Sequence, residues 1–174
     1  MTPPVTLRSA SPADATQLAE FARRNFAETF GPSNTPEDLE LHLSYTYSPD
    51  IQRRELSNPR FTTILAESEG KLAGYAQLRE TKAPASVTSA EPIELLRFYV
   101  DRPWQGRGVA RLLMEAVFGA ARARGAGSVW LCVWQENPRA IAFYEREGFR
   151  RVGTQDFLLG TDVQLDWVMA RDIG

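Results

Sequence analysis

The chain has very few of the residues that bind metals or form disulfides. Its 174 residues include one cysteine and one histidine. One cysteine cannot form an internal disulfide, and Cys132 lies in the apolar run 129–133, where a small buried core residue is expected rather than a catalytic thiol. His42 lies in a segment expected to be helical, where a surface or core position is expected rather than a catalytic one. We therefore expect no metal site and no disulfide framework.

Long runs of one residue type are also missing. No apolar stretch approaches the roughly 20 residues that span a membrane, and the N-terminal residues lack the basic and apolar segments of a secretory signal. No block of Lys and Arg indicates a nucleic-acid surface, and the formal net charge is −2. These features predict a cytoplasmic protein without membrane or nucleic-acid partners. The length and the 43% hydrophobic content fit a single domain, residues 1–174.

The first half of the chain predicts helices followed by strands. A short strand is expected at 5–8, and Ser11-Pro12 is typical of a helix start, with Gly31-Pro32 ending that helix. Further helices are expected from Thr35-Pro36 and over 48–56. Strands are expected at 61–67 and 72–79 as a hairpin, a loop at 81–92, and an apolar central strand at 93–100.

The second half alternates between the two kinds of element. A helix is expected over about 108–124, a buried strand over 128–134, and a helix from Asn137-Pro138 to Gly148. Alternating Leu165, Trp167 and Met169 predict a last strand. The pattern therefore predicts an α+β (mixed α/β) fold, in which antiparallel strands precede a strand–helix–strand–helix–strand unit.

The segment Gln105–Ala110 predicts a phosphate-binding turn between a strand and a helix. A helix N-terminus has unpaired N–H groups and partial positive charge. Gly106 and Gly108 allow close approach of an anion, and Arg107 and Arg111 can add charge pairing.

Three phosphate-loop motifs compete for this segment. The P-loop pattern is absent, and the dinucleotide pattern fails because Arg111 occupies its third glycine position and no Asp or Glu lies between Gly119 and Gln135. The pattern Gln-x-x-Gly-x-Ala is met by Gln105, Gly108 and Ala110. This motif alone leaves open a plain glycine-containing loop.

A second group of residues follows in 137–149. Asn137 and Tyr144 are seven residues apart, so they share one helix face. On this helix Phe143 and Tyr144 could also be core aromatics. The order of elements and motifs within 93–149 resembles the GCN5-related N-acetyltransferases (GNAT family). Segments 26–30, 94–100, 130–134 and 164–166 are further similar to the PaiA-type polyamine acetyltransferases of that family.

This resemblance implies a GNAT-like central, mostly antiparallel twisted sheet with helices on both faces. It implies acetyl-CoA as co-substrate, Tyr144 as the general acid that protonates the leaving thiolate, and a backbone N–H, most plausibly of Val100, facing the thioester oxygen. The resemblance further implies a homodimer. The residues expected to bind acetyl-CoA are Phe98, Tyr99, Val100, Gln105, Gly106, Arg107, Gly108, Val109, Ala110, Arg111, Asn137, Ala140, Phe143, Tyr144 and Arg146.

The sequence identifies the residues that would act on the acceptor amine less clearly than those expected to bind acetyl-CoA. An alkyl amine is protonated at neutral pH, because its pKa lies near ~10.4, so a general base or a water relay must remove a proton. Glu94 is the candidate base, with a strand-end ion pair as an equal alternative. If the acceptor is a polyamine, acidic side chains should line its pocket, and the candidates are Glu28, Glu37, Asp38, Glu91, Asp162 and Asp166.

The sequence therefore predicts an acetyl-CoA-dependent N-acetyltransferase that acts on a primary amine of a small molecule, with spermidine or spermine as examples. The alternative is a non-catalytic acyl-CoA-binding regulatory protein with the same fold.

Overall fold

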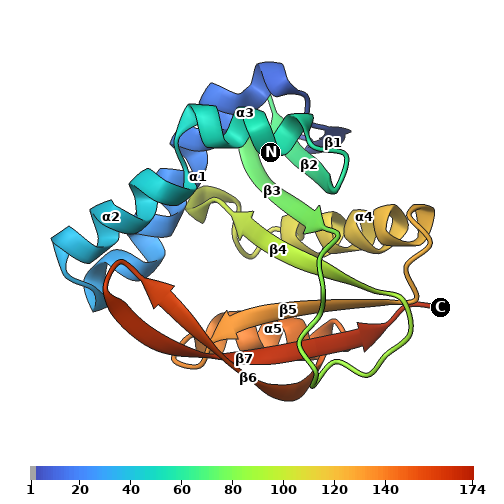
Figure 1. The fold of residues 1–174 in the computed structure, drawn as a ribbon. Helices are drawn as coiled ribbons and strands as arrows, with labels where there is room; N and C mark the ends of the chain where they lie inside the picture. The colour runs from blue at the N-terminus through green and yellow to red at the C-terminus, as the bar shows by residue number, and fades with distance from the viewer. Residues whose placement is uncertain (1–2) are drawn as a thin grey trace.

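A computed structural model describes residues 3–174 as one seven-stranded sheet with helices on both faces (Figure 1). The strands are β1 (Thr6–Ser9), β2 (Phe61–Ser68), β3 (Lys71–Arg79), β4 (Pro92–Val100), β5 (Ser128–Trp134), β6 (Arg150–Leu159) and β7 (Asp162–Asp172). The α-helices are α1 (Ala15–Phe30), α2 (Pro36–Thr46), α3 (Pro49–Ser57), α4 (Val109–Ala123) and α5 (Pro138–Arg146). Short 3₁₀ turns are η1 (Pro12–Asp14), η2 (Gly31–Ser33) and η3 (Arg102–Trp104).

The strand order β1-β2-β3-β4-β5-β7-β6 is antiparallel except between β4 and β5. Those two parallel strands pair only over Pro92–Glu94 and Ser128–Trp130. Beyond that contact β4 pairs only with β3, and β5 pairs only with β7. The two halves of the sheet therefore diverge like the arms of a V, which Figure 1 shows between β4 and β5.

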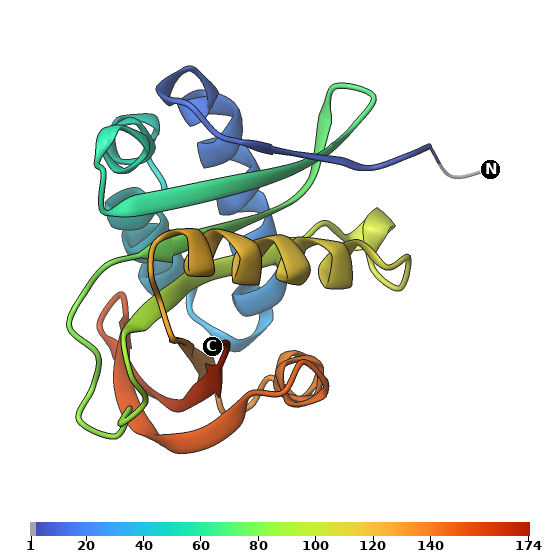
Figure 2. The same cartoon turned by 90° about the vertical axis from the view of Figure 1, so that its right-hand side faces the viewer.

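Each face of the sheet has its own core. On one face, α4 and α5 pack apolar side chains such as Leu113 and Ile141 against Leu78, Leu95 and Leu131. Figure 2 shows α4 lying along this face. On the opposite face, α1 and α2 cover Leu65 and Tyr75. The central strands of the sheet are thus covered on both faces, and a gap remains between the two halves.

The predicted fold class is confirmed, and the predicted helices and strands occur within a few residues of their expected bounds. One strand was not predicted: β6 forms a hairpin with β7, and the sequence pattern indicated only β7. Most of β6 is exposed, so it lacks the apolar alternation that identifies a strand. This edge strand extends the C-terminal arm of the V.

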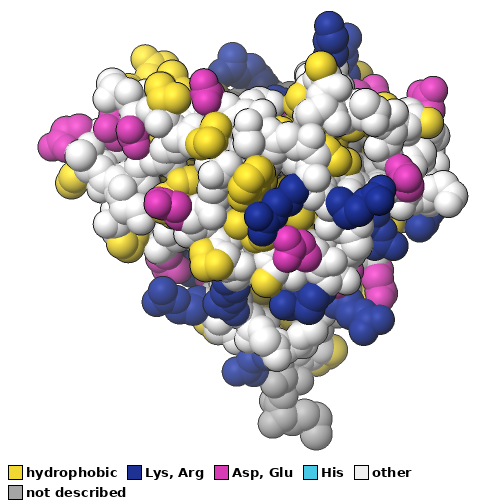
Figure 3. Space-filling model, turned by 90° about the horizontal axis from the view of Figure 1, so that it is seen from below, with side chains coloured by type: hydrophobic (Ala, Val, Ile, Leu, Met, Phe, Trp, Pro, Cys, Tyr) yellow, Lys and Arg dark blue, Asp and Glu magenta, His cyan; other side chains and the backbone are white. Residues whose placement is uncertain are grey.

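None of the helices in residues 3–174 is both long enough and apolar enough to cross a membrane. In the same residues, no three His, Cys, Asp or Glu side chains are grouped so that they could hold a metal ion. On the face seen in Figure 3, basic side chains are interspersed with acidic and apolar ones.

Candidate active site

One cleft of about 1200 Å³ occupies the gap between β4 and β5. It reaches from the N-terminus of α4 to α1, α2 and the β6–β7 hairpin. Every predicted catalytic or acetyl-CoA-binding residue lines it except Arg107 and Val109. The side chain of Val109 is buried in the core beneath α4. The fold therefore brings Glu94, the 98–100 segment, the 105–111 turn and the 137–146 segment into one continuous site.

The turn before α4 is held in shape by its own residues. The Gln105 side-chain amide donates to the Val100 carbonyl oxygen over 3.0 Å, which ties the turn to the end of β4. Gly106 has φ 74° and Gly108 has φ 81°. A Cβ atom at either glycine would meet no protein atom within 4 Å. The left-handed backbone therefore favours glycine here, and the space outside the turn is open to a ligand.

No side chain of residues 3–174 caps the N-terminus of α4. Gly108 is the N-cap residue, and the first turn carries no acidic residue. Four arginines from η3, α4 and α5 line the same cleft. These are Arg102, Arg111, Arg139 and Arg146. Unpaired N–H groups, the positive end of the helix dipole and these guanidinium groups together suit a polyanionic group such as a pyrophosphate.

The edge of β4 that faces the gap carries backbone polar groups without a strand partner. The Asp101 N–H bonds the Ala73 carbonyl oxygen toward β3, whereas the Val100 carbonyl points the other way, to Gln105. Alternation along the strand places the backbone groups of Phe98 on the same free edge. The register shift between β3 and β4 leaves Leu96 as an extra residue, which bends β4 away from β5. An extended amide-containing chain could pair with this edge.

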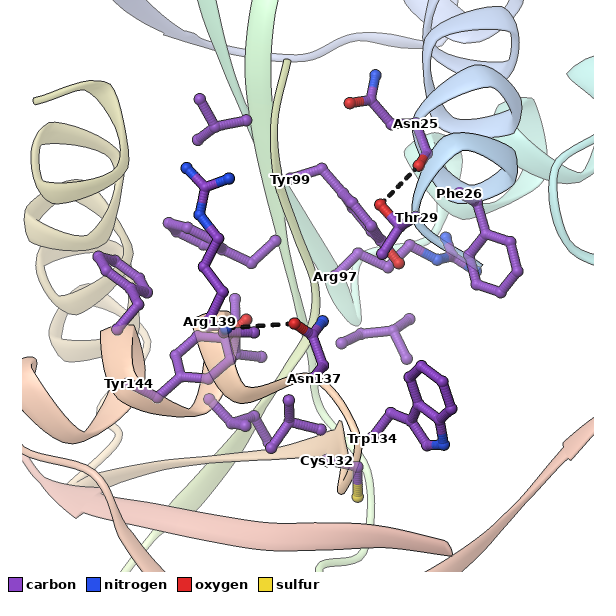
Figure 4. Close-up of a pocket in the computed structure, with 18 of the residues that line it drawn as sticks. Asn25, Phe26, Thr29, Arg97, Tyr99, Cys132, Trp134, Asn137, Arg139 and Tyr144 are labelled. Atoms are coloured by element: carbon purple, nitrogen blue, oxygen red, sulfur yellow. Dashed lines mark hydrogen bonds between the residues drawn. The ribbon is translucent and has the colours of Figure 1, made fainter. Parts of the chain in front are cut away.

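Asn137 and Tyr144 both line the cleft from α5 (Figure 4). The Asn137 side-chain oxygen accepts from the Ala140 N–H over 3.3 Å and so caps the helix. Tyr144 is buried, and its ring lies 6.2 Å from that of Phe98 and 5.8 Å from that of Phe149. Burial raises its pKa above the usual value of 10.0. The residue is therefore a core aromatic whose hydroxyl stays protonated at the cleft wall.

Glu94 lines the floor of the V, where β4 and β5 are still joined. Its Oε2 accepts from Arg79 at 2.8 Å (Nε) and 2.7 Å (Nη2). Burial raises the pKa of Glu94, and the charge and hydrogen bonds of Arg79 oppose that rise. Glu94 is thus a strand-end ion-pair partner whose carboxylate also lines the cleft.

The end of the cleft away from α4 is built by α1, α2 and the C-terminal hairpin. Of the six acidic residues considered from the sequence, Glu28 and Asp166 line it and the other four do not. Asp38 instead binds the Thr161 N–H and hydroxyl at 2.6 and 2.7 Å, which fastens α2 to the β6–β7 turn. Sequence alone could not separate these carboxylates, because each fits an ordinary surface position.

His42 and Cys132 both lie at this end of the cleft. The imidazole of His42 stacks on the Phe26 ring at 4.5 Å, and burial together with the charge of Arg97 lowers its pKa to about 4. Cys132 was expected in the core but is only half-buried and lines the cleft. Burial raises the pKa of its thiol to about 12. At neutral pH His42 is therefore neutral and Cys132 is an unreactive thiol.

A buried ionic group behind this end of the cleft was not predicted. Arg97 on β4 donates to the Glu55 carboxylate on α3 and to the Gln77 side-chain oxygen at 2.6 Å. Its guanidinium also lies 5.0 Å from the centre of the Tyr47 ring. The only sequence signal was an arginine in a mostly apolar strand, and its partner lies 42 positions away. This group fixes α3 against the sheet beside the cleft.

Comparison with known proteins identifies relatives along nearly the whole chain. The Acetyltransferase (GNAT) family matches residues 18–149. An uncharacterized N-acetyltransferase of Mycobacterium tuberculosis is 33% identical over 160 residues, which cover 92% of this chain and 98% of that protein. The N-alpha-acetyltransferase RimI of the same organism is 31% identical over 173 residues, with 99% and 96% covered.

A solved structure extends the comparison to the fold. The PaiA N-acetyltransferase from Thermoplasma acidophilum, in complex with coenzyme A, superposes with a TM-score of 0.79. The alignment covers 97% of this chain and 99% of that chain, at 21% sequence identity. At this sequence identity the likeness concerns the fold.

Proposed function

The chain belongs to the GNAT acetyltransferase family, and we propose that the acceptor of its acetyl group is a primary amine of a small cationic molecule. Polyamines are the leading class of acceptor. The chain is an N-acetyltransferase that uses acetyl-CoA as the donor. The observation that carries this proposal is the charge distribution in the cleft. Arginines of η3, α4 and α5 line it beside the uncapped helix N-terminus, whereas Glu28, Asp156 and Asp166 line it from α1, β6 and β7. One cleft thus offers cationic groups for a phosphate donor and carboxylates for an amine.

The residues at the α4 end fit acetyl-CoA. The open space outside Gly106 and Gly108, which an added Cβ would reach without meeting protein, accommodates a pyrophosphate close to the backbone. The free edge of β4 at Phe98 and Val100 suits the amide groups of the pantetheine arm. Acetyl-CoA supplies an activated acyl group and a thiolate leaving group.

The chain then has to orient the amine and move two protons. We propose that Tyr144, which stays protonated because burial raises its pKa, donates a proton to the departing sulfur. The Val100 N–H, on the same strand edge as its carbonyl, is proposed to stabilise charge on the thioester oxygen. Glu94 is proposed to accept the amine proton, directly or through water, while Arg79 holds its Oε2 in place.

Two kinds of acceptor are supported by different observations. The similarity of segments 26–30 and 94–100 to PaiA-type enzymes, and the carboxylates of the acceptor end, favour a polyamine. The 31% identity to RimI, named as an N-alpha-acetyltransferase, favours the α-amine of a peptide. A small molecule with more than one ammonium group makes better use of several carboxylates than a peptide N-terminus does.

An acceptor screen tests this proposal. Purified protein and acetyl-CoA are incubated with polyamines, amino acids or peptides, and free thiol is measured with a chromogenic disulfide. Polyamines are expected to give the highest kcat/KM. A higher kcat/KM for peptides would replace the polyamine assignment, and thiol release with none of the amines would contradict the proposal.

The role of Glu94 is tested with Glu94→Gln. We expect kcat/KM to fall by about 10²-fold or more, because a general base contributes on that order. The rise of kcat with pH on the acid side should also disappear, because a base acts only above its own pKa. If the variant loses thermal stability but keeps the wild-type pH profile, Glu94 serves only as the partner of Arg79.

A further inference from the structure

Asp166 is a buried carboxylate in the cleft wall without a partner on one oxygen. It lies on β7, is only 7% exposed, and lines the cleft. Its Oδ1 atom is buried and accepts no hydrogen bond from any residue of the described range 3–174. A buried carboxylate oxygen without a donor is costly, so such a group in a cleft indicates a cationic or N–H-bearing ligand.

The groups around Asp166 do not include a basic partner. Its register neighbours are Trp134 on β5 and Gln155 on β6. Cys132 on β5 lies close enough to Asp166 and Glu94 for their charges to raise the pKa of its thiol. Arg79 of β3 forms its ion pair with Glu94. Within residues 3–174 no Lys, Arg or His forms an ion pair with Asp166.

Aromatic side chains complete the surroundings. Trp134 stands directly across from Asp166 in the β5–β7 pairing, so the two side chains project from the same face of the sheet. The Phe30 ring of α1 lies 5.8 Å from Trp134, and both line the cleft. Figure 4 shows Trp134 and Cys132 on β5, with Tyr144 on the separate helix α5. A carboxylate beside an indole suits an alkylammonium group.

From this arrangement we propose that Asp166 and Trp134 bind a second ammonium group of the acceptor, away from the nitrogen that is acetylated. The inference rests on the proposed amine acetyltransferase function and narrows its substrate class to diamines and longer polyamines. The reacting nitrogen must approach the edge of β4, and β7 lies beyond β5 on the other arm of the V. A flexible alkyl chain between the two ammonium groups can span this gap.

The arrangement also gives the binding a pH dependence with a definite sign. Burial raises the pKa of Asp166 from 3.8 to about 6. Below about pH 6 the carboxyl is neutral, so affinity for the second ammonium should fall as the pH falls. His42 is neutral above about pH 4 and the Cys132 thiol below about pH 12, so neither should contribute in this range.

A binding comparison tests the proposal without depending on turnover. Protein saturated with CoA is titrated by calorimetry with 1,6-diaminohexane or with hexylamine, which has the same chain and one ammonium group. Wild-type protein is expected to bind the diamine at least about tenfold more tightly than hexylamine, because a hydrogen bond to a charged group contributes on that order. Asp166→Asn should remove that difference, together with the loss of diamine affinity between pH 7 and pH 5.

Asp162→Asn is the matched control, because Asp162 is an exposed residue of the same strand and bonds only Gln164 among the described residues. It should retain the preference. CoA affinity and thermal unfolding report whether Asp166→Asn is folded. Equal binding of diamine and hexylamine by wild type, or a diamine preference that survives Asp166→Asn, overturns the proposal. Unchanged binding with a lower kcat for both amines would instead make Asp166 the proton acceptor. The binding outcomes remain readable even if no acetyl transfer occurs.

Discussion

Replacement of Tyr144 by Phe separates its chemical role from its structural one. The ring contacts with Phe98 at 6.2 Å, Phe143 at 5.5 Å and Phe149 at 5.8 Å would persist, because Phe keeps the ring. In residues 3–174 the Tyr144 hydroxyl makes no hydrogen bond that the substitution would break. The free energy of unfolding should therefore change by less than about 1 kcal/mol.

The effect on turnover should be much larger than the effect on stability. A positioned general acid contributes roughly 10²–10⁴-fold, so kcat is expected to fall by at least about 10²-fold at neutral pH. The affinity for acetyl-CoA should stay within about twofold, because the contacts of the turn and of the β4 edge do not involve the hydroxyl.

The measurement combines thiol release, calorimetric titration with CoA, and thermal unfolding. Tyr45→Phe is the matched control, since Tyr45 is 76% exposed and should leave all three quantities unchanged. A kcat within about threefold of wild type would refute the assignment and leave proton donation to water or another group. A large fall in CoA affinity would mean that the Tyr144 hydroxyl binds the cofactor rather than donating a proton to the departing sulfur.

Three further predictions follow from buried charges and backbone geometry. Glu55→Gln removes the carboxylate that pairs with buried Arg97 and should lower the free energy of unfolding in urea by about 3–5 kcal/mol. Glu40→Gln, at an exposed ion pair, should lower it by less than about 1 kcal/mol. Equal losses in the two variants would contradict this prediction. Gly108→Glu should abolish CoA binding, and Gly108→Ala at φ 81° should cost about 1–2 kcal/mol of stability; retained binding in Gly108→Glu would remove the phosphate-turn assignment. Asp166→Asn should stabilise the unliganded protein at pH 7 by up to about 3 kcal/mol. The pKa of Asp166 is raised in the folded protein, so the wild type loses stability as the pH rises from 3.8 to about 6, whereas the variant does not. The gain in stability should vanish near pH 3, and a pH-independent difference would refute this reasoning.

Local signals determined much of the fold. Ser and Thr before Pro started helices, glycines ended them, and apolar runs identified β4 and β5. The turn at Gln105–Ala110 was likewise local, since left-handed glycines and a helix start depend on neighbours in the chain. Strand β6 was missed because an exposed edge strand has no apolar face to form a pattern.

The residues that line the end of the cleft away from α4 could not be predicted from local sequence signals. Nothing in the sequence distinguishes Asp166 from Asp162, because burial of the former depends on the pairing of β7 with β5 and β6. The partnership of Glu94 with Arg79 and that of Arg97 with Glu55 also join separate elements.

The sequence by itself determined the fold class, most of the helices and strands, and the glycine turn at Gln105–Ala110, because these depend largely on residues close in the chain. Only the tertiary structure decided which carboxylates share a cleft and which of them lacks a partner. The free energy of a buried charge depends on everything packed around it, and for Asp166 those neighbours come from strands that are distant in sequence.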